Sequence, residues 1–146
     1  MTIEGTYEPS SWRWVAEQVE AYEASGGTEA NTLRDTGIPI IVFTTTGRNT
    51  GLVRKVALMR VEHDGEYALV ASKGGSPQHP GWYHNLISDP SIIMQDGPEP
   101  WPTTVRIVTG AERALWWERA VAVYAPYAEY QEKTDREIPI FVTSRR

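Results

Sequence analysis

Apolar side chains recur along the chain at two spacings, which predict helices and strands in a definite order. Near the start, four apolar residues follow one another at steps of three to four: Trp12, Val15, Val19 and Tyr22. This is the period of an amphipathic helix, so we expect a helix over about 11–24 with Ser10 or Ser11 as its N-cap. The sequence Ser25-Gly26-Gly27 is expected to end it.

Six runs rich in β-branched and other apolar residues are typical of strands. They cover 38–46, 52–62, 66–73, 91–95, 103–109 and 138–143. The turn GRNTG at 47–51 and the hairpin sequence HDG at 63–65 closely join the first three runs. We therefore expect these three strands to form an antiparallel meander.

Three further stretches are predicted to be helical: 80–88, 111–124 and 127–134. Pro80 suits the first position of a helix, and Asp89-Pro90 stops it. Thr109 and Glu112 have the spacing of a capping box, which favours a helix start. Pro126 separates the last two helical pieces.

The order of these elements predicts the fold class. The predicted order is a helix, three meandering strands, a helix, two strands, a helical region and a strand. This order lacks regular βαβ alternation. That order favours an α+β fold that is mainly β, an antiparallel sheet or small barrel with helices packed around it. We expect one domain over residues 1–146. The chain has no G-x-G-x-x-G after a first strand and no G-x-x-x-x-G-K-[ST], so a Rossmann fold is disfavoured.

Composition narrows the functional classes. The chain has no cysteine, which excludes disulfides and thiolate chemistry and is compatible with a reducing cytosol. It shows neither a signal-peptide pattern nor an apolar run long enough to span a membrane. The net charge of −5 argues against general nucleic-acid binding.

Charge is distributed unevenly. Residues 44–60 contain four basic side chains and no acidic one: Arg48, Arg54, Lys55 and Arg60. Residues 71–88 contain Lys73 and again no acid. In an acidic protein this distribution favours an anionic ligand, with a solvated cluster of loop charges as the alternative.

Metal and nucleophilic chemistry are weakly supported. The three histidines, His63, His79 and His84, do not have ligand spacing, so we expect no metal site. No G-x-S-x-G elbow is present, and Ser72 is better placed as a hydrogen-bond donor to a ligand than as a nucleophile.

Two glycine-containing turns, 47–51 and 72–75, can bring backbone N–H groups and basic side chains close to an anion. Each is also compatible with an ordinary turn between strands. Tyr124, Tyr127 and Tyr130 recur at steps of three, which places them roughly on one side of a helical segment. They could form a packed aromatic stripe or a hydroxyl-bearing wall over a ligand.

Three blocks of sequence together resemble one family: TTTGRNTGLVRK, VASKGGSPQHPGWYHNL and YAPYAEYQEKTDREIPIFV. In this order they are similar to the deazaflavin-dependent nitroreductases and F-420H2-dependent quinone reductases of actinobacteria, over about residues 11–142. The resemblance implies a split β-barrel of the pyridoxamine-phosphate-oxidase-like kind with flanking helices. It also implies coenzyme F-420, an 8-hydroxy-5-deazaflavin with a phosphodiester and an oligoglutamate tail.

The resemblance also implies roles for individual residues. Those expected to bind the coenzyme are Arg48, Asn49, Thr50, Gly51, Arg54, Lys55, Met59, Ala71, Ser72, Lys73, Gly74, Gly75, Pro80, Trp82, Tyr83 and Asn85. Those expected on the catalytic, acceptor-facing side are Ser72, Tyr124, Tyr127 and Tyr130. Asn49 stands where the family has a lysine, which implies either weaker binding of the tail or compensation by the nearby cation Lys55.

The implied function is hydride transfer from the reduced deazaflavin to quinones, nitroaromatics or activated C=C bonds. A non-catalytic F-420 carrier and an FMN- or haem-binding split-barrel protein are the alternatives. The expected partner is a small-molecule acceptor, without nucleic acid or an integral membrane segment. Monomer and homodimer both stay open. The expected location is the cytoplasm, with peripheral contact at the inner membrane face as an open alternative.

Overall fold

A computed structural model describes residues 3–33 and 36–145. Its helices are α1 (Arg13–Ala24), α2 (Gly81–Ser88), α3 (Gly110–Val123) and α4 (Pro126–Glu132), with a short 3-10 turn, η2 (Lys73–Gly75). Its strands are β1 (Ile40–Thr46), β2 (Val53–Met59), β3 (Glu62–His63), β4 (Glu66–Val70), β5 (Ser91–Gln95), β6 (Trp101–Ile107) and β7 (Ile140–Thr143). The helices and strands predicted from the sequence are thus present in the predicted order.

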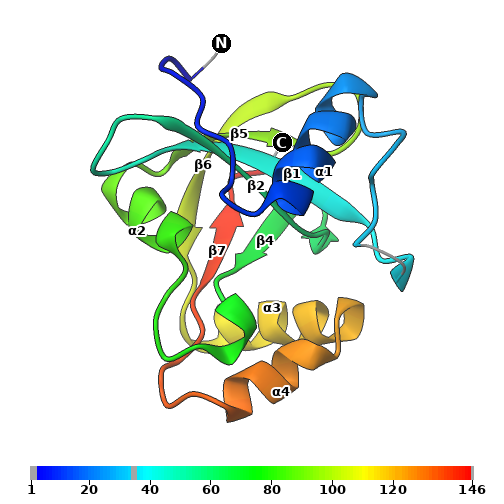
Figure 1. The fold of residues 1–146 in the computed structure, drawn as a ribbon. Coiled ribbons are helices and arrows are strands. Elements are labelled where there is room, and N and C mark those ends of the chain that lie inside the picture. Colours follow the sequence, from blue (N-terminus) through cyan, green and yellow to red (C-terminus); the bar gives the residue numbers. More distant parts are fainter. Residues whose placement is uncertain (1–2, 34–35, 146) are drawn as a thin grey trace.

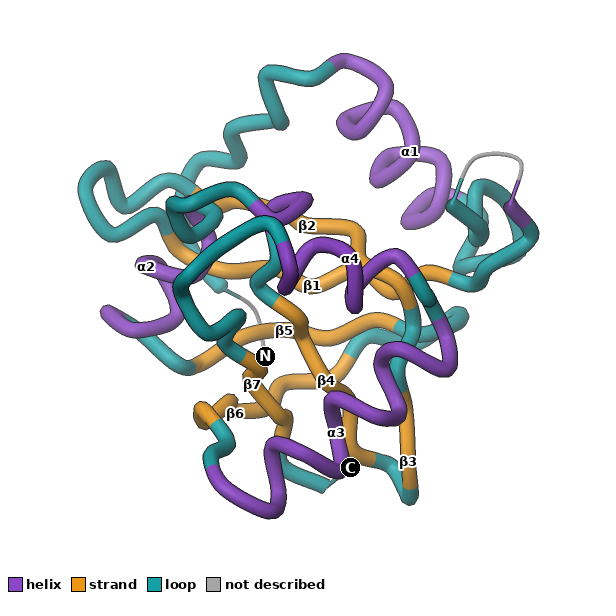
Figure 2. Tube along the Cα trace, turned by 90° about the horizontal axis from the view of Figure 1, so that it is seen from below, coloured by secondary structure: helices purple, strands orange, loops and turns teal. Residues whose placement is uncertain are grey.

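The strands form one antiparallel sheet in the order β2-β1-β5-β6-β7-β4-β3. β1 and β2 pair along their whole length, from Ile40 opposite Met59 to Thr46 opposite Val53. The sheet curls into a half-barrel, with α3 and α4 at its lower end and α1 beside β1 and β2 (Figure 1). Seen from below, α3 and α4 lie across that end of the strands (Figure 2). The predicted antiparallel barrel with flanking helices is confirmed.

β1 is buried on both faces, and because successive side chains of a strand point to opposite faces, each face packs against a different helix. Ile40 and Val42 pack with Val19 and Tyr22 of α1. The intervening residues Ile41 and Phe43 belong to the main core, where Trp82 of α2 packs edge-on against Phe43 at 5.4 Å between ring centroids. A second core cluster joins α3 and α4 to β4 and β7. The buried strand expected over 38–46 is confirmed by this two-sided burial.

The run expected as one strand over 52–62 is in fact two. β2 ends at Met59, and β3 at Glu62–His63 pairs with β4 at the opposite edge of the sheet. Only Arg60 and Val61 connect the two strands. Because successive residues reach about 3.3–3.6 Å at most, the two edges must come close together, and this closure curls the sheet.

Helix starts and one strand end also differ from the prediction. Trp12 is the N-cap residue of α1, and Ser10 contributes by accepting a hydrogen bond from the Trp12 N–H at 3.2 Å. Thr109 is the N-cap residue of α3 but makes no side-chain cap, and the Glu112 carboxylate accepts hydrogen bonds from both terminal nitrogens of Arg106 at 2.7 Å. A strong bidentate ion pair thus replaces the predicted capping box.

β4 ends at Val70, so the predicted strand over 66–73 is three residues too long. Lys73, Gly74 and Gly75 have φ values of 46°, 63° and 83°, a left-handed turn that ends the extended backbone. β6 begins earlier than expected and includes Pro102, which pairs with Ile93 of β5. β6 pairs with β7 only over Val105–Ile107, so the half of β6 that contains Pro102 has no partner on that side. Proline has no backbone N–H to donate, and its lack is tolerated there because no strand on that side needs it.

The η2 turn packs closely on α4. A Cβ added to Gly75 would lie 2.7 Å from the backbone oxygen of Tyr130 and 3.0 Å from its Cα. A Cβ added to Gly74 would meet nothing within 4 Å. The two neighbouring glycines therefore share a left-handed backbone and differ in the space around them.

We expect Gly75→Ala to destabilise the protein much more than Gly74→Ala. Both variants incur the cost of an alanine at positive φ, roughly 1–2 kcal/mol. Gly75→Ala must in addition displace the α4 backbone, which adds about 1–3 kcal/mol. Urea unfolding of both variants and the wild type measures this difference. Equal losses would show that the approach of η2 to α4 contributes nothing to stability.

Candidate functional site

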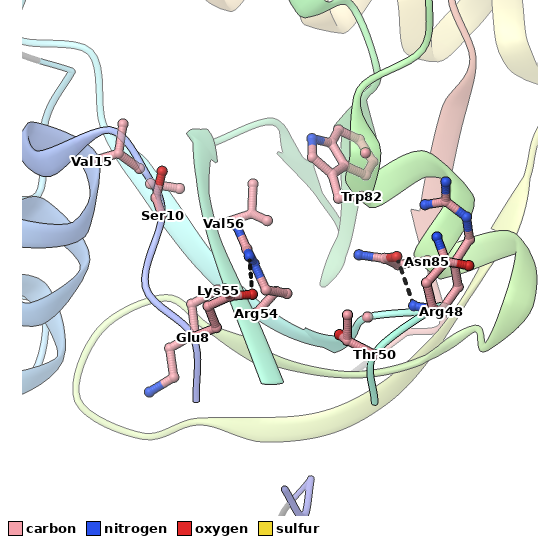
Figure 3. A pocket seen from close by; sticks show the side chains of 14 residues that line it. Glu8, Ser10, Val15, Arg48, Thr50, Arg54, Lys55, Val56, Trp82 and Asn85 are labelled. Atoms are coloured by element: carbon pink, nitrogen blue, oxygen red, sulfur yellow. Dashed lines mark hydrogen bonds and ion pairs between the residues drawn. The ribbon is translucent and has the colours of Figure 1, made fainter. Parts of the chain in front are cut away.

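A pocket of about 450 Å³ lies beside β2, between the N-terminal segment, the 47–51 turn and α2 (Figure 3). It is lined by Glu8, Ser10, Val15, Gly47, Arg48, Asn49, Thr50, Arg54, Lys55, Val56, Ala57, Gly81, Trp82 and Asn85. Two kinds of surface meet there. Charged and polar groups gather around the turn and the first half of β2, and the indole of Trp82 supplies an apolar wall.

The 47–51 turn is closed by its own backbone and fastened to α2. The Gly47 N–H donates to the Leu52 oxygen at 2.8 Å, and the Gly51 N–H donates to the Gly47 oxygen at 2.9 Å. A Cβ at Gly47 would lie 2.8 Å from the Thr50 hydroxyl oxygen, so a larger residue there would have to move the Thr50 side chain. From α2, the buried Asn85 accepts a hydrogen bond from the Arg48 N–H at 3.0 Å. Asn85 thereby fixes the position of the turn at the rim of the pocket.

Two neighbouring cations on β2 each meet a carboxylate from the N-terminal part of the chain. Arg54 Nη1 lies 2.7 Å from Oε2 of Glu8 (Figure 3). Lys55 Nζ lies 2.7 Å from Oε1 of Glu23 on α1 and 4.7 Å from the ring centroid of Tyr7. The segment that is free of acidic residues in sequence therefore has acidic neighbours in space.

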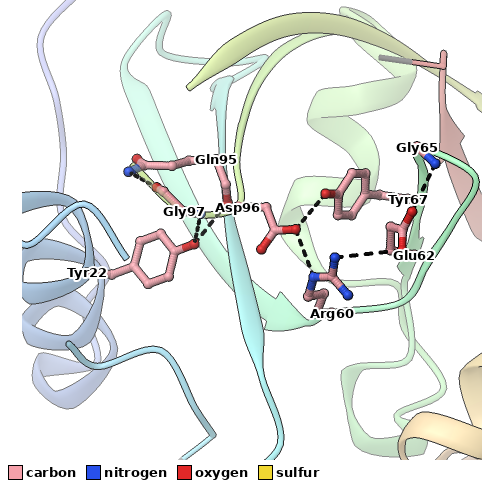
Figure 4. Close-up of polar contacts among 8 residues, drawn as sticks. All are labelled: Tyr22, Arg60, Glu62, Gly65, Tyr67, Gln95, Asp96 and Gly97. Atoms are coloured by element: carbon pink, nitrogen blue, oxygen red, sulfur yellow. Dashed lines mark hydrogen bonds and ion pairs between the residues drawn. The ribbon is translucent and has the colours of Figure 1, made fainter. Parts of the chain in front are cut away.

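Arg60, the fourth cation of that sequence segment, lies outside the pocket lining. Its Nε donates to Oδ2 of Asp96 at 2.7 Å, and the same oxygen accepts a hydrogen bond from the Tyr67 hydroxyl at 2.5 Å (Figure 4). Burial, together with the Asp96 carboxylate, raises the pKa of Tyr67 to about 12. Arg60 thus joins β3, β4 and the turn after β5 where the two sheet edges approach, and its basic charge serves the fold.

The 71–79 segment is held by one guanidinium. Arg136 donates to the backbone oxygens of Ala71, Ser72 and Ser76 at 3.2, 2.8 and 2.9 Å. Its Nη1 also lies 3.1 Å from Nδ1 of His79. Burial lowers the pKa of His79 below 6.5, and the charge of Arg136 and the His84 ring act in the same direction. A neutral imidazole that accepts at Nδ1 fits this arrangement.

The three tyrosines form one aromatic cluster on and beside α4. Ring centroids of Tyr124 and Tyr127 are 5.0 Å apart, and the hydroxyls of Tyr124 and Tyr130 are 3.0 Å apart. Tyr127 is buried, which raises its pKa above the ordinary phenol range and favours the packed-stripe interpretation for this ring. The hydrogen bond that the Tyr130 hydroxyl shares with Tyr124 holds the Tyr130 proton in place and, together with burial, raises the pKa of Tyr130 to about 12. Tyr124 and Tyr130 stay partly exposed.

The predicted coenzyme-binding residues fall into two groups. The pocket lining includes Arg48, Asn49, Thr50, Arg54, Lys55, Trp82 and Asn85. It does not include Gly51, Met59, Ala71, Ser72, Lys73, Gly74, Gly75, Pro80 or Tyr83. Met59, at the far end of β2, packs against the core cluster that α3 and α4 form with β4 and β7. Residues 71–75 follow β4 and face α4 and Arg136, and their predicted role stays a prediction.

Sequence reasoning missed several lining residues. Val56 and Ala57 come next to Arg54 and Lys55 on the same strand. Because alternate residues of a strand share a face, the strand pattern could have predicted them as lining residues. Glu8, Ser10 and Val15 come from a segment distant in sequence, and nothing in their local pattern indicates that they reach β2.

The donor set of the pocket fits an extended, acidic ligand. Arg48 and Arg54 offer guanidinium forks, which match carboxylate and phosphate oxygens in geometry. The carboxylate of Glu8 already sits on Arg54, which shows that this position accepts an anionic oxygen. Among the described residues, no cluster of three or more histidines and acids is placed to hold a metal ion. No helix in the described ranges is long and apolar enough to cross a bilayer.

Comparison with known proteins gives a consistent result. A family model described as F420H(2)-dependent quinone reductase matches residues 14–145. An F420H(2)-dependent quinone reductase of Mycobacterium tuberculosis is 36% identical over 111 residues, which cover 74% of each chain. A solved F420-H2 dependent reductase is 54% identical with a TM-score of 0.69, covering 73% of this chain and 94% of that one. A further solved structure, described as a domain-swapped dimer, is 49% identical with a TM-score of 0.71 and covers 92% and 100% of the two chains.

The lowered pKa of His79 predicts a pH dependence of stability. Its folded-state pKa lies below the ordinary value of 6.5, so the folded protein binds fewer protons than the unfolded chain in that interval. Stability should be complete above about pH 6.5 and fall as the pH drops below it. Urea midpoints between pH 7.5 and 5 should fall less steeply in His79→Gln than in the wild type. The control is His63→Gln, because His63 lies in the β3–β4 hairpin, away from Arg136. If the urea midpoint of His79→Gln fell as steeply with pH as that of the wild type, the role of His79 would be refuted.

Proposed function

The chain belongs to the F420H(2)-dependent quinone reductase family, and from this premise we propose that it is a reductase that uses reduced coenzyme F-420. The initial resemblance to this family is confirmed by the family model and by the relatives. The activity is that of an oxidoreductase. The particular acceptors, and the roles of individual residues, are part of the proposal.

One observation carries the residue-level proposal. β2 runs from the cationic pocket at Arg54 to Met59, and Met59, Tyr124 and Tyr130 each pack against the same core cluster. At about 3.3 Å per residue, that span is roughly 17 Å. An extended ligand lying along β2 would place its anionic end on Arg48 and Arg54. Its ring system would then lie toward Met59 and the tyrosines.

When bound, the reduced deazaflavin supplies a hydride from C5 for an electron-poor acceptor. The chain's own residues orient the ligand and stabilise charge. Arg48 and Arg54 bind the acidic end, and the indole of Trp82 shields the middle of the pocket from water. Tyr130, with its raised pKa, stays protonated at neutral pH and can donate a hydrogen bond to the oxygen that gains negative charge. Ser72, which is buried beside Arg136, is the second proposed donor.

The acceptor classes are proposed as quinones, nitroaromatics and activated C=C bonds. A partly exposed aromatic pair, Tyr124 and Tyr130, suits flat molecules of this kind. A cytoplasmic location, as expected from the resemblance, stays part of this proposal.

We expect the purified protein to oxidise reduced F-420 when menadione is added, with recovery of the visible absorbance of the oxidised deazaflavin. Tyr130→Phe should lower kcat about tenfold or more, because it removes the proposed donor to the developing charge. Coenzyme affinity should change little in that variant. Binding without turnover on any quinone, nitro or enone acceptor would instead support the carrier alternative. Binding of FMN or haem in preference to F-420 would support the alternative of an FMN- or haem-binding split-barrel protein.

For assembly we propose a homodimer, supported by the 49% identical relative described as a domain-swapped dimer. In a swapped dimer each chain contributes an identical element to its partner's fold. Light scattering coupled to size-exclusion chromatography should give about twice the mass of one 16.4 kDa chain. A single peak at the monomer mass across the micromolar range would contradict the proposal.

A further inference from the structure

The N-terminal segment Gly5–Glu8 is fastened to the edge of the sheet beside the pocket. The Val53 N–H donates to the Thr6 oxygen at 2.8 Å, and the Glu8 N–H donates to the Val53 oxygen at 2.9 Å. Gly5 touches the 47–51 turn, since a Cβ there would lie 3.0 Å from the Gly51 oxygen. The backbone of this segment therefore extends the sheet at β2, and it positions the Glu8 side chain at the pocket.

The Glu8 carboxylate occupies Arg54 in a way that a ligand can reverse. Their side chains are 50% and 35% exposed, and exposed ion pairs contribute little to stability. The side chains of Lys55 and Glu23 are less exposed, at 21% and 30%, so this ion pair is the more buried of the two. The bonds that fix the N-terminal segment are backbone bonds, so the Glu8 side chain can leave Arg54 by rotation alone. Of the two ion pairs, the one between Glu8 and Arg54 is therefore the more easily exchanged.

The Glu8 carboxylate is chemically the same group as the side chain of a glutamate in an oligoglutamate tail. A position on Arg54 that accepts one accepts the other, because the guanidinium presents the same donors to both. A ligand carboxylate that reaches Arg54 must displace Glu8 or share the guanidinium with it. In either case the two negative charges repel each other.

We propose that Glu8 is a specificity-determining residue that competes, as an internal carboxylate, with the glutamate tail of the coenzyme for Arg54. This inference rests on the proposed function. Glu8 limits the affinity that the site gains from tail carboxylates and leaves the binding of the ring system unchanged. The charge of residue 8 therefore sets how strongly the protein discriminates between tail-bearing and tail-less deazaflavins.

The test compares three ligands against the wild type and Glu8→Gln. The ligands are the deazaflavin riboside, its 5′-phosphate and the full coenzyme with its glutamates. Glu8→Gln should bind the full coenzyme about fivefold more tightly than the wild type, as expected for the release of one exposed ion pair. The affinities for the riboside and the 5′-phosphate should not change. Fluorescence titration at low salt measures all six dissociation constants.

Two variants provide the controls. Glu112→Gln removes the same charge from an exposed ion pair with Arg106, far from the pocket, and should leave all affinities unchanged. In an Arg54→Ala background, the gain from Glu8→Gln should disappear, because the shared guanidinium is gone.

Three results would overturn the inference: an equal gain with the riboside, an equal gain with the 5′-phosphate, or a gain that persists without Arg54. The first would indicate a general charge or folding effect, and the second would assign Arg54 to the phosphate. Failure of the proposed function gives a different result, in which the wild type binds none of the three ligands.

Discussion

The two edge strands of the sheet, β2 and β3, are separated by only two residues, and this constraint shapes the whole molecule. A seven-stranded sheet whose edges are that close along the chain must curl. Arg60, one of the two connecting residues, pairs with Asp96, which also receives the Tyr67 hydroxyl. This partly buried polar network therefore lies at the point where the two edges of the sheet approach each other. The curl in turn leaves the outer surface of β2 open to the N-terminal segment and the pocket.

A second fixed point is Arg136, which lies between α4 and β7. Its guanidinium donates to three backbone oxygens of the 71–79 segment, those of Ala71, Ser72 and Ser76. Gln131 of α4 donates to the Arg136 backbone oxygen at 2.8 Å. The segment after β4, the helix that carries the tyrosines and the start of the last strand are thus one unit. A lysine at position 136 could not replace the arginine, because a single ammonium lacks the planar set of five donors.

The order of helices and strands could be predicted from the sequence because periodicity reports burial directly. Both faces of β1 are buried, and the uninterrupted apolar run at 38–46 reflects this. Closure at Arg60 was not predictable, since residues 52–62 continue one strand pattern across the break. The structure brings Arg48, Arg54, Trp82 and Asn85 to one pocket, and their role in binding the coenzyme stays a prediction.

The charge environment of the pocket was only half predictable. Local counting identified the cations of 44–60 correctly, but their partners Glu8, Glu23 and Asp96 come from other parts of the chain. Sequence distance hides such pairs, because an ion pair depends on the three-dimensional path of the backbone. The 71–75 turn illustrates the same limit. Its glycines predict an anion cradle, a role that stays a prediction, but they do not reveal that Gly75 packs against the backbone of Tyr130.

The pairing of Thr6 and Glu8 with Val53 has a consequence for the solution behaviour of the protein. β2 is an edge strand, and unpaired edge strands are templates for strand addition by other chains. Residues 5–8 cover the beginning of that edge with the chain's own backbone. A version of the protein shortened past residue 8 would expose those N–H and C=O groups. We expect this shortened protein to self-associate edge to edge before the packing of its core is disturbed.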